Sequence, residues 1–519
     1  MADTKPDDQA ETIAFLMSPE AYGGETSEVI RIDTHCASVF LSGNRAYKLK
    51  RAVKFPYLDY STLSKREEFC KREMMINRLT SPQLYLAVVP VTREESGGLA
   101  IDGGGVPVDW LVVMRQFDNN LLFDHLASTH QLSSVLLTSL AIRIREFHSN
   151  TYVVYDTPWV ESFQKVVGDL EATLCGANGM ATGLQCHPHI EALRRTVDDL
   201  SGLMLAREEA GYVRHCHGDL HLKNIVLFDD EPVLFDAIEF DDKLTNIDVL
   251  YDLAFLLMDL WHRGLRREAN TVFNRYFQRD VPIDEWGGLA LLPMFIAVRA
   301  GVRAMVGIHG LSLAKDTKAH AETIESIHSY ARLAADALSP SKPRLVAVGG
   351  FSGSGKTTLA RAIVPEVGSI PGAVHIRSDV ERKLYHGVDL LHHLPPAFYT
   401  VESREVVYQH IIERAEAVLN AGHSVILDAV FFCADWRERV QQMAERAGVS
   451  FCGLWLEADP VQMMARVTLR SGDASDATPQ VVAEQIQSAS VPEEWHKIDT
   501  RGTVDATVKA ATTILKQTA

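Results

Sequence analysis

Long apolar runs are absent from this 519-residue sequence. Its most apolar stretch, Leu289–Val298, is far shorter than the ~20 residues that a membrane-spanning helix needs, so we interpret it as a buried core helix. The start, Met1–Glu11, is polar and acidic and lacks the basic and apolar segments of a secretory signal. We therefore expect a cytoplasmic protein without a membrane partner.

Closely spaced cysteine pairs are missing as well. The sequence has 7 Cys residues, and they form no CxxC pair and no zinc-type spacing. We expect free, partly buried thiols in a reducing compartment.

Clustered basic residues are also scarce, and the formal net charge is −17. This argues against a general polyanion binder, because affinity for a phosphate backbone relies on clustered Lys and Arg. Hydrophobic content of 46% and charged content of 23% are ordinary for a globular protein. The length exceeds one ordinary hydrophobic core, so we expect a multidomain chain.

The order of predicted elements changes along the chain. After an N-terminal extension, residues 1–27, strand patterns prevail to about residue 117, and mostly helical periodicity runs over 118–338. Tyr212–Phe240 interrupts the helical part with a β-like pattern. A Pro/Ser linker, 339–343, precedes a segment, 344–519, in which strands and helices alternate, which is typical of an α/β fold with a parallel sheet.

The segment Gly350–Thr357 matches the phosphate-binding motif GxxxxGK[ST], between a predicted strand and a helix. Backbone N–H groups of such a loop curl around phosphate oxygens at a helix N-terminus. We expect Lys356 to reach the β- and γ-phosphates of ATP and the Thr357 hydroxyl to ligate Mg²⁺. The expected nucleotide contacts are Gly350, Ser352, Gly353, Ser354, Gly355, Lys356, Thr357 and Thr358.

Candidate catalytic side chains follow the next strands of this segment. Asp379 could accept the proton of an acceptor hydroxyl, and the alternative for this residue is a helix N-cap. Arg382 could hold a substrate anion, and the alternative is a solvated helix face. We favour the catalytic roles. Asp428 ends a buried strand and is predicted to act on Mg²⁺. Arg466 and Arg470 lie one turn apart and are predicted to neutralise charge on the transferring phosphoryl group, or else to form an exposed basic face.

The second strong motif is His217-Gly218-Asp219, followed by Asn224, in the form H-x-D-x₄-N. A carboxylate and an amide five residues apart in a tight loop can face the same phosphoryl group. Asp219 would take the acceptor proton and Asn224 would ligate Mg²⁺. Asp236, after the next strand, is placed to hold the same metals, and a polar loop with capped ends is the alternative.

An upstream partner set is available for this motif. Lys48 and Lys50 alternate onto one strand face, and one of them, with Lys48 favoured, should contact the phosphates. Glu73 on the following helix is the expected ion-pair partner. Asp252 is predicted to support the catalytic loop through hydrogen bonds.

These motifs resemble those of two kinase families. Residues 344–519 resemble small P-loop kinases related to polynucleotide kinase, gluconate kinase and zeta toxin, in which the residues matching Asp379 and Arg382 activate and grip the acceptor. Residues 28–338 resemble the aminoglycoside-phosphotransferase-like branch of the protein-kinase fold, which implies an α+β domain with an N-lobe to about residue 117. The sequence departs from protein kinases because Thr34–Ser38 replaces a glycine-rich loop and no glycine follows Asp236 as in DFG.

The whole chain resembles bacterial proteins described as bifunctional aminoglycoside-phosphotransferase-like/ATP-binding proteins. We therefore expect a bifunctional, ATP- and Mg²⁺-dependent kinase that acts on hydroxyls or amines of small molecules. Three alternatives stay open. One module could regulate the other by sensing nucleotide, the P-loop module could phosphorylate a short nucleic-acid 5′ end, or the N-terminal module could modify an antibiotic.

Overall fold

The computed structural model describes residues 9–24, 28–55, 58–155, 157–278, 281–311, 316–470, 472–488 and 491–518. The predicted N-terminal extension therefore lies partly outside the described residues. Contacts divide the chain into two compact units, Met1–Lys165 with Met204–Asp259 and Val166–Leu203 with Leu260–Ala519. This division differs from the sequence boundary at 339–343, which stays a prediction.

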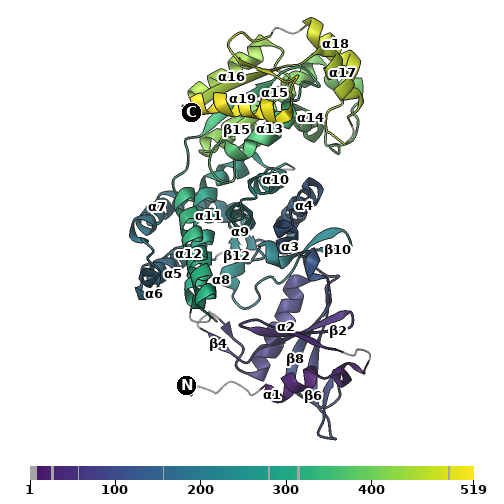
Figure 1. The fold of residues 1–519 in the computed structure, drawn as a ribbon, viewed down its shortest axis with the longest axis vertical. Helices are drawn as coiled ribbons and strands as arrows, with labels where there is room; N and C mark the ends of the chain where they lie inside the picture. Colours follow the sequence, from purple (N-terminus) through teal and green to yellow (C-terminus); the bar gives the residue numbers. More distant parts are fainter. Residues whose placement is uncertain are drawn as a thin grey trace. The chain divides into compact units, whose positions relative to one another are not determined.

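The first unit contains an antiparallel sheet in the order β1-β2-β3-β8-β6-β7 (Figure 1). Its strands are β1 (Ile30–Asp33), β2 (Ala37–Ser42), β3 (Arg45–Lys50), β6 (Tyr85–Arg93), β7 (Leu99–Ile101) and β8 (Val106–Arg115). The predicted strand–turn–strand pattern is confirmed, because β2 pairs with β3 from Ala37 opposite Lys50 to Ser42 opposite Arg45. Helix α2 (Leu63–Asn77) packs on β8 and β6.

The rest of the first unit includes a polar loop between β9 and β10. Its other helices and strands are α1 (Ala10–Leu16), β4 (Lys54–Phe55), β5 (Leu58–Asp59), α3 (Phe123–Ser128), α4 (Ser134–Asn150), β9 (Val213–His215), β10 (Ile225–Phe228), β11 (Glu231–Leu234), α8 (Asp242–Thr245), β12 (Asn246–Asp248) and most of α9 (Val249–His262). The predicted β-like interruption of the helical region is thus confirmed. It places the H-x-D-x₄-N motif between β9 and the β10–β11 hairpin.

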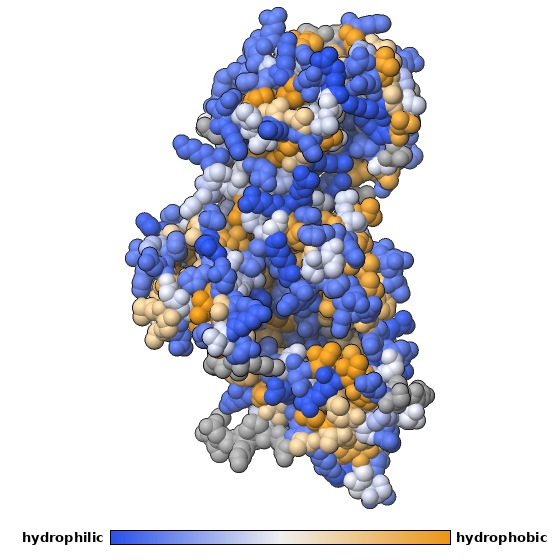
Figure 2. Space-filling view, viewed as in Figure 1, coloured by the Kyte–Doolittle hydropathy of each residue, from blue (hydrophilic) through white to orange (hydrophobic). Residues whose placement is uncertain are grey.

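The second unit includes a helical part. Its helices are α6 (Ala177–Ala181), α10 (Arg266–Tyr276), the 3₁₀ segment η4 (Ile283–Leu291), α11 (Leu292–Gly310) and α12 (Thr317–Ala337), while α5 (Trp159–Leu174) and α7 (His187–Glu209) are shared with the first unit. Among the described residues, the segment Ile283–Gly310 is apolar enough to span a membrane, but 67% of its most apolar window is buried inside the protein. The prediction of a core helix at Leu289–Val298 is therefore confirmed. Hydrophilic side chains cover most of the face shown in Figure 2.

A five-stranded parallel sheet forms the C-terminal part of the second unit, in the order β14-β15-β13-β16-β17. The strands are β13 (Arg344–Gly349), β14 (Val374–Arg377), β15 (Val425–Asp428), β16 (Ser450–Glu457) and β17 (His496–Asp499). The accompanying helices are α13 (Lys356–Ile363), α14 (Ser378–Tyr385), α15 (Val401–Asn420), α16 (Ala434–Arg446), α17 (Pro460–Thr468), α18 (Pro479–Ser488) and α19 (Val504–Gln517). The predicted alternation and parallel sheet are confirmed, and the carboxyl ends of β13, β14 and β15 meet at one edge of the sheet, where ligands bind in such folds.

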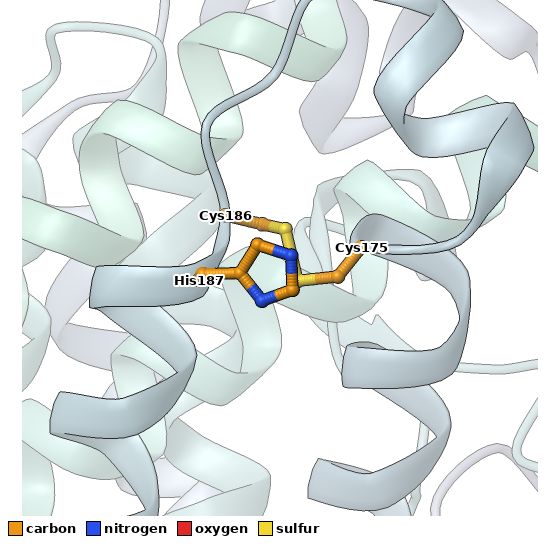
Figure 3. A group of neighbouring side chains, drawn as sticks. All are labelled: Cys175, Cys186 and His187. Carbon is orange, nitrogen blue, oxygen red and sulfur yellow. A yellow bond between two sulfur atoms is a disulfide. The ribbon is translucent and has the colours of Figure 1, made fainter.

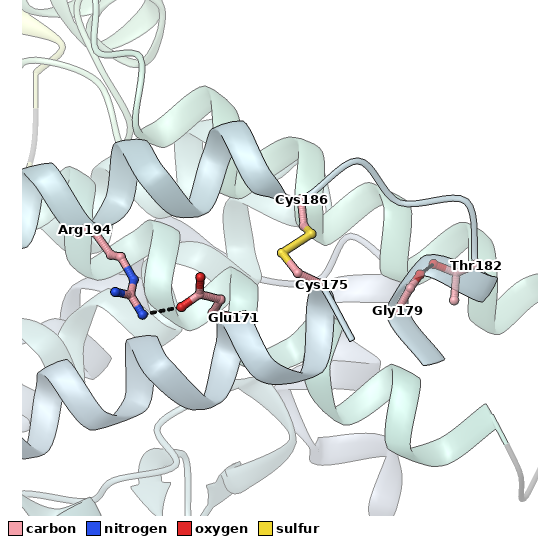
Figure 4. The surroundings of a disulfide bond; sticks show 6 residues. All are labelled: Glu171, Cys175, Gly179, Thr182, Cys186 and Arg194. Atoms are coloured by element: carbon pink, nitrogen blue, oxygen red, sulfur yellow. Dashed lines mark hydrogen bonds and ion pairs between the residues drawn. A yellow bond between two sulfur atoms is a disulfide. The ribbon is translucent and has the colours of Figure 1, made fainter. Parts of the chain in front are cut away.

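One expectation about the cysteines is wrong. Cys175 and Cys186 form a disulfide with a Cα–Cα distance of 5.6 Å (Figure 4). The other cysteines are free. The short helix α6 lies between the two cysteines in the sequence and lets the chain fold back, so an 11-residue separation still satisfies disulfide geometry. A search for CxxC spacing could not find this pair.

Candidate functional sites

The phosphate-binding loop joins β13 to α13, as predicted. Three of its glycines have positive φ, namely Gly350 (138°), Gly353 (82°) and Gly355 (98°). A Cβ at Gly353 would lie 2.5 Å from the Met463 carbonyl oxygen. Any other residue at this position would therefore be strained as well as crowded.

The loop opens onto a cavity that most of the predicted P-loop site residues share. Its lining is Ser352, Gly353, Gly355, Lys356, Thr357, Thr358, Ser378, Asp379, Asp428, Val430, Arg470 and Ser475. Within it, the Thr357 hydroxyl donates to Asp428 Oδ2 at 2.6 Å. A threonine hydroxyl beside a strand-end carboxylate suits the oxygen-only coordination that Mg²⁺ prefers, and the curled loop suits a triphosphate.

Asp428 lies in strongly charged surroundings. Burial opposes its ionisation, but a hydrogen bond from His375 and the positive charges of Arg377 and Lys356 outweigh that effect and hold its pKa below the usual range. Burial conversely lowers the pKa of Lys356, whose ammonium donates to the Phe351 carbonyl at 3.0 Å. The site thus combines a stable carboxylate with a lysine that has no carboxylate at ion-pair distance in the described residues.

Four predicted residues lie outside the cavity lining, namely Gly350, Ser354, Arg382 and Arg466. The buried Arg382 donates to the Phe398 carbonyl at 3.3 Å, and its guanidinium lies 4.8 Å from the centre of the Tyr399 ring. Arg466 donates to the Gly353 carbonyl at 3.3 Å and so braces the phosphate-binding loop from behind.

The sequence interpretation missed several polar residues of this site, among them Arg377, Asp473 and Gln485. Arg377 donates to Asp473 at 2.9 Å and 3.2 Å, which ties the end of β14 to the segment after α17. Gln485 on α18 accepts from the Ser352 amide at 2.9 Å. An Arg just before Ser378-Asp379 was a visible signal, whereas the partners Asp473 and Gln485 lie about a hundred residues away and carry no motif.

In the first unit, the catalytic-loop residues come together as predicted. Asn224 Nδ2 donates to Asp219 Oδ2 at 2.9 Å and to the Asp219 carbonyl at 2.9 Å. The Asn224 carbonyl accepts from the Phe235 amide at 3.0 Å, so the loop adjoins the residue before Asp236. Asp219, Asn224 and Asp236 therefore belong to one site.

A buried support lies beneath this loop. Asp252 accepts from the amides of His217 at 3.1 Å and Gly218 at 2.9 Å, as predicted for a supporting residue. Gly218 has a φ of 80°, and a Cβ there would lie 2.8 Å from the Leu244 carbonyl oxygen. Burial lowers the pKa of His217, whose Nε2 donates to the Phe235 carbonyl at 2.9 Å, so this ring is neutral and structural.

Lys48 connects the N-terminal sheet to the catalytic loop. Its ammonium lies 2.8 Å from Glu73 Oε1 and 2.6 Å from Asp236 Oδ1. Burial opposes the charge of Glu73, but the ammonium groups of Lys48 and Lys50 outweigh burial and lower its pKa to about 2. The predicted pairing of Lys48 with Glu73 is thus present.

Lys50 lies in a different environment on the same strand face. Only 1% of its side chain is exposed, and its ammonium pairs with Glu73 Oε2 at 2.5 Å and with Glu239. Tyr60 donates its hydroxyl to the same Glu239 carboxylate. This burial favours Lys48 over Lys50 as the phosphate contact and makes Lys50 a support for Glu73.

Two groups of potential metal ligands occur in the described ranges. Cys175, Cys186 and His187 form the first, but their sulfurs are joined in the disulfide and offer no thiolate (Figure 3). His148, Cys216 and Asp252 form the second, and there Asp252 already accepts two backbone amides. In both groups the potential ligand atoms are already used in other bonds, so we assign no metal site to either group.

Comparisons with known proteins agree with the two-part pattern of sites. Residues 125–292 match the phosphotransferase enzyme family, and residues 345–492 match the AAA domain family. An uncharacterized protein of Mycobacterium tuberculosis is 28% identical over 491 residues, which cover 92% of this chain and 94% of that protein.

Solved structures similar to parts of the chain include kinases. A gluconokinase from Sinorhizobium meliloti is 20% identical and covers 34% of this chain and 93% of its own, with a TM-score of 0.26. A choline/ethanolamine kinase family protein from Mesorhizobium loti is 13% identical and covers 63% of this chain and 98% of its own, with a TM-score of 0.38. The family matches, together with the two sites, mark the chain as an ATP-dependent phosphotransferase with a kinase-like part and a P-loop part.

Proposed function

From a chain that joins a phosphotransferase-family segment to a P-loop segment, we propose a bifunctional kinase that phosphorylates small molecules at two separate sites. The observation that carries the proposal is the shared cavity of Lys356, Thr357, Asp379, Asp428 and Arg470. A phosphate-binding loop alone would support nucleotide binding. A carboxylate and an arginine in the same cavity add groups that phosphoryl transfer requires.

In the P-loop site, each side chain has a distinct task. Asp379 accepts the proton of the acceptor hydroxyl as that oxygen bonds to the γ-phosphorus of ATP. The bond from this phosphorus to the bridging oxygen breaks, and ADP leaves. Lys356 and Arg470 stabilise the negative charge on the transferring group, because positioning and charge neutralisation carry most of such catalysis. Thr357 and Asp428 would hold Mg²⁺, which would supply positive charge to neutralise the phosphates.

In the kinase-like site, Asp219 is the proton acceptor and Asn224 keeps its carboxylate oriented through the 2.9 Å hydrogen bond. Asn224 and Asp236 would hold the metal. Lys48 contacts the phosphates while Glu73 and Lys50 hold it in place. In this proposal, Lys48 exchanges its contact with Asp236 for a phosphate oxygen when nucleotide binds.

The acceptors are proposed as metabolites with a hydroxyl or amine. The Arg382 guanidinium donates to the Phe398 carbonyl and lies over the Tyr399 ring. Arg382 would therefore bind the P-loop acceptor only if Phe398 and Tyr399 moved aside. Three alternatives remain: a nucleotide-sensing module, an antibiotic kinase and a nucleic-acid 5′-end kinase. The reaction products distinguish them from the proposed function, whereas ATP binding does not.

The test is a metabolite-library screen for ATP consumption with product detection by mass spectrometry. The wild-type chain, Asp219→Asn and Asp379→Asn are compared, because both substitutions keep size and remove a carboxylate. We expect two products, each lost in only one variant. The proposal of two activities fails if a single product depends on Asp219 alone or on Asp379 alone, and a nucleotide-sensing role would show as altered kinetics without a second product.

A further inference from the structure

Among the described residues, strand β14 pairs only with β15 and is therefore an edge strand of its sheet. An edge strand presents unpaired backbone N–H and C=O groups on its free side. Within the second unit, helix α10 lies along this side. Asn274 Oδ1 accepts from the His375 amide at 2.7 Å, and Asn274 Nδ2 donates to the Ala373 carbonyl at 3.2 Å.

Asn270, one helical turn before Asn274, forms hydrogen bonds to the residues just before β14. Asn270 Nδ2 donates to the carbonyls of Pro371 at 3.0 Å and Ala373 at 3.2 Å. Asn270 is only 6% exposed, and it also accepts from Asn274 Nδ2 at 3.0 Å. The two side-chain amides therefore stand in for a neighbouring strand, because an amide can donate and accept as a peptide group does.

The strand held in this way carries part of the P-loop site. His375 lies 3.5 Å from Asp428 Oδ2, and Arg377 lies 3.6 Å from the same oxygen. Ser378 and Asp379 follow directly and line the cavity. A displacement of β14 would therefore move Asp379 relative to Lys356, which lies on a different element.

The end of α10 also reaches the charged side of this site. Burial and the neighbouring guanidinium groups of Arg361 and Arg377 lower the pKa of Arg275 to about 10. The geometric link between this helix and the strand is the set of hydrogen bonds from Asn270 and Asn274.

We infer that Asn270 and Asn274 are positioning residues of the P-loop site, so that a helix within the phosphotransferase-family match sets the geometry of the other catalytic centre. Both asparagines lie inside residues 125–292 and outside residues 345–492, the two segments that match families. The site is therefore incomplete in the C-terminal segment alone. The catalytic readout of this inference rests on the proposed kinase function, whereas the strand contact can be tested without it.

The experiment uses the full chain with Asn274→Ala and Asn270→Ala, and Arg267→Ala as the matched control because Arg267 is exposed on the same helix. Asn274→Asp is included because aspartate still accepts from the His375 amide but no longer donates to Ala373. Hydrogen exchange of peptides spanning residues 371–384 and 344–349 is measured together with the P-loop turnover, the KM for ATP and the unfolding temperature.

We expect Asn274→Ala to speed exchange in the 371–384 peptide while the central strand β13 is unaffected. The P-loop kcat should fall about 10- to 100-fold, with the KM for ATP within about twofold, because small displacements of reacting groups cost rate of this order. Asn274→Asp should recover part of the protection, and the Asp219-dependent activity should not change.

Exchange and kcat equal to those of the Arg267→Ala control would overturn the inference. A parallel loss of ATP binding, kcat and unfolding temperature would also overturn it, by showing a purely structural role. If the wild-type chain shows no P-loop turnover, the proposed function fails, and the exchange comparison still decides whether the asparagines hold β14.

Discussion

In the P-loop site, the loop and its lysine come from eight consecutive residues, whereas the kinase-like site collects its charges from distant positions. Lys48 meets Glu73 and Asp236, which are 25 and 188 residues away. Lys356 instead bonds a carbonyl of its own loop. In one site the lysine is already neutralised by carboxylates, and in the other it is free to receive phosphate charge. This difference leads to different responses to mutation.

The largest expected effect separates the two proton acceptors. Asp219→Asn should lower the kinase-like turnover by about 10²- to 10⁴-fold, the usual contribution of a general base, and should leave the P-loop product unchanged. Asp379→Asn should do the reverse. Product-specific turnover assays measure both rates, with unfolding temperature as the control for folding. A fall of both products in either variant would mean that the two sites are not independent.

The next effect separates the two lysines of β3. Lys50→Met removes one partner from a buried ion-pair network and leaves Glu239 uncompensated, so the free energy of unfolding should fall by about 3–5 kcal/mol. Lys48→Met should lower the free energy of unfolding less. Its partner Asp236 has a side chain that is 44% exposed, so water can solvate the carboxylate when the lysine is removed. Lys48→Met should instead raise the KM for ATP.

Urea unfolding and steady-state kinetics check this pair of variants. Equal losses of stability, or a higher KM for ATP in Lys50→Met at unchanged stability, would contradict the assignment of Lys48 as the phosphate contact. The comparison thus distinguishes a ligand from a support on one strand face.

The disulfide should have an intermediate effect confined to its own region. Cys175→Ser should lower the free energy of unfolding by about 2–3 kcal/mol, the typical contribution of a short disulfide loop. Both catalytic turnovers should remain unchanged, because neither cysteine lines the P-loop cavity or belongs to the H-x-D-x₄-N motif. Alkylation followed by peptide mass spectrometry shows whether the bond forms, and Cys433→Ser, at a free cysteine, is the control. Two alkylated thiols at Cys175 and Cys186 in the unreduced protein would contradict the bond.

The P-loop site was easier to predict from the sequence than the kinase-like site, because its loop is contiguous whereas the charged residues of the kinase-like site are dispersed. The P-loop motif is contiguous, so the strand before it, the phosphate-binding loop and the helix after it were predictable from the sequence. The pairing of Lys48 with Glu73 followed from strand alternation and one helix. The role of Lys50 was not predictable, since its partner Glu239 and the nearby Tyr60 are brought together only by tertiary folding.

Other features carried no local signal at all. Asn270 and Asn274 are ordinary polar residues of a helix until the edge of β14 is placed beside them. The Cys175–Cys186 pair depends on the short helix between its members. The sequence positions of Arg382 and Arg466 on their helices fitted a role at the cavity. Spacing predicts which face of a helix a residue lies on, but it does not predict which group that face contacts.

The smallest expected effect is the pH dependence of stability that Glu73 contributes in the kinase-like site. The pKa of Glu73 is lowered to about 2 in the folded protein, so its ionised form stabilises the fold above the unfolded-state pKa. That stabilisation is lost as the pH falls through the folded pKa, and about 1 kcal/mol of it should be gone by pH 4 relative to pH 7. The measurement is the difference in unfolding free energy between the wild-type chain and Glu73→Gln over this range. The variant should be less stable at pH 7, and the gap should narrow toward pH 4 because the glutamine carries no titrating charge. A constant gap would mean that Glu73 stabilises the site through packing rather than through the two lysines, and the contrast between a neutralised and a free lysine would then lose its electrostatic basis.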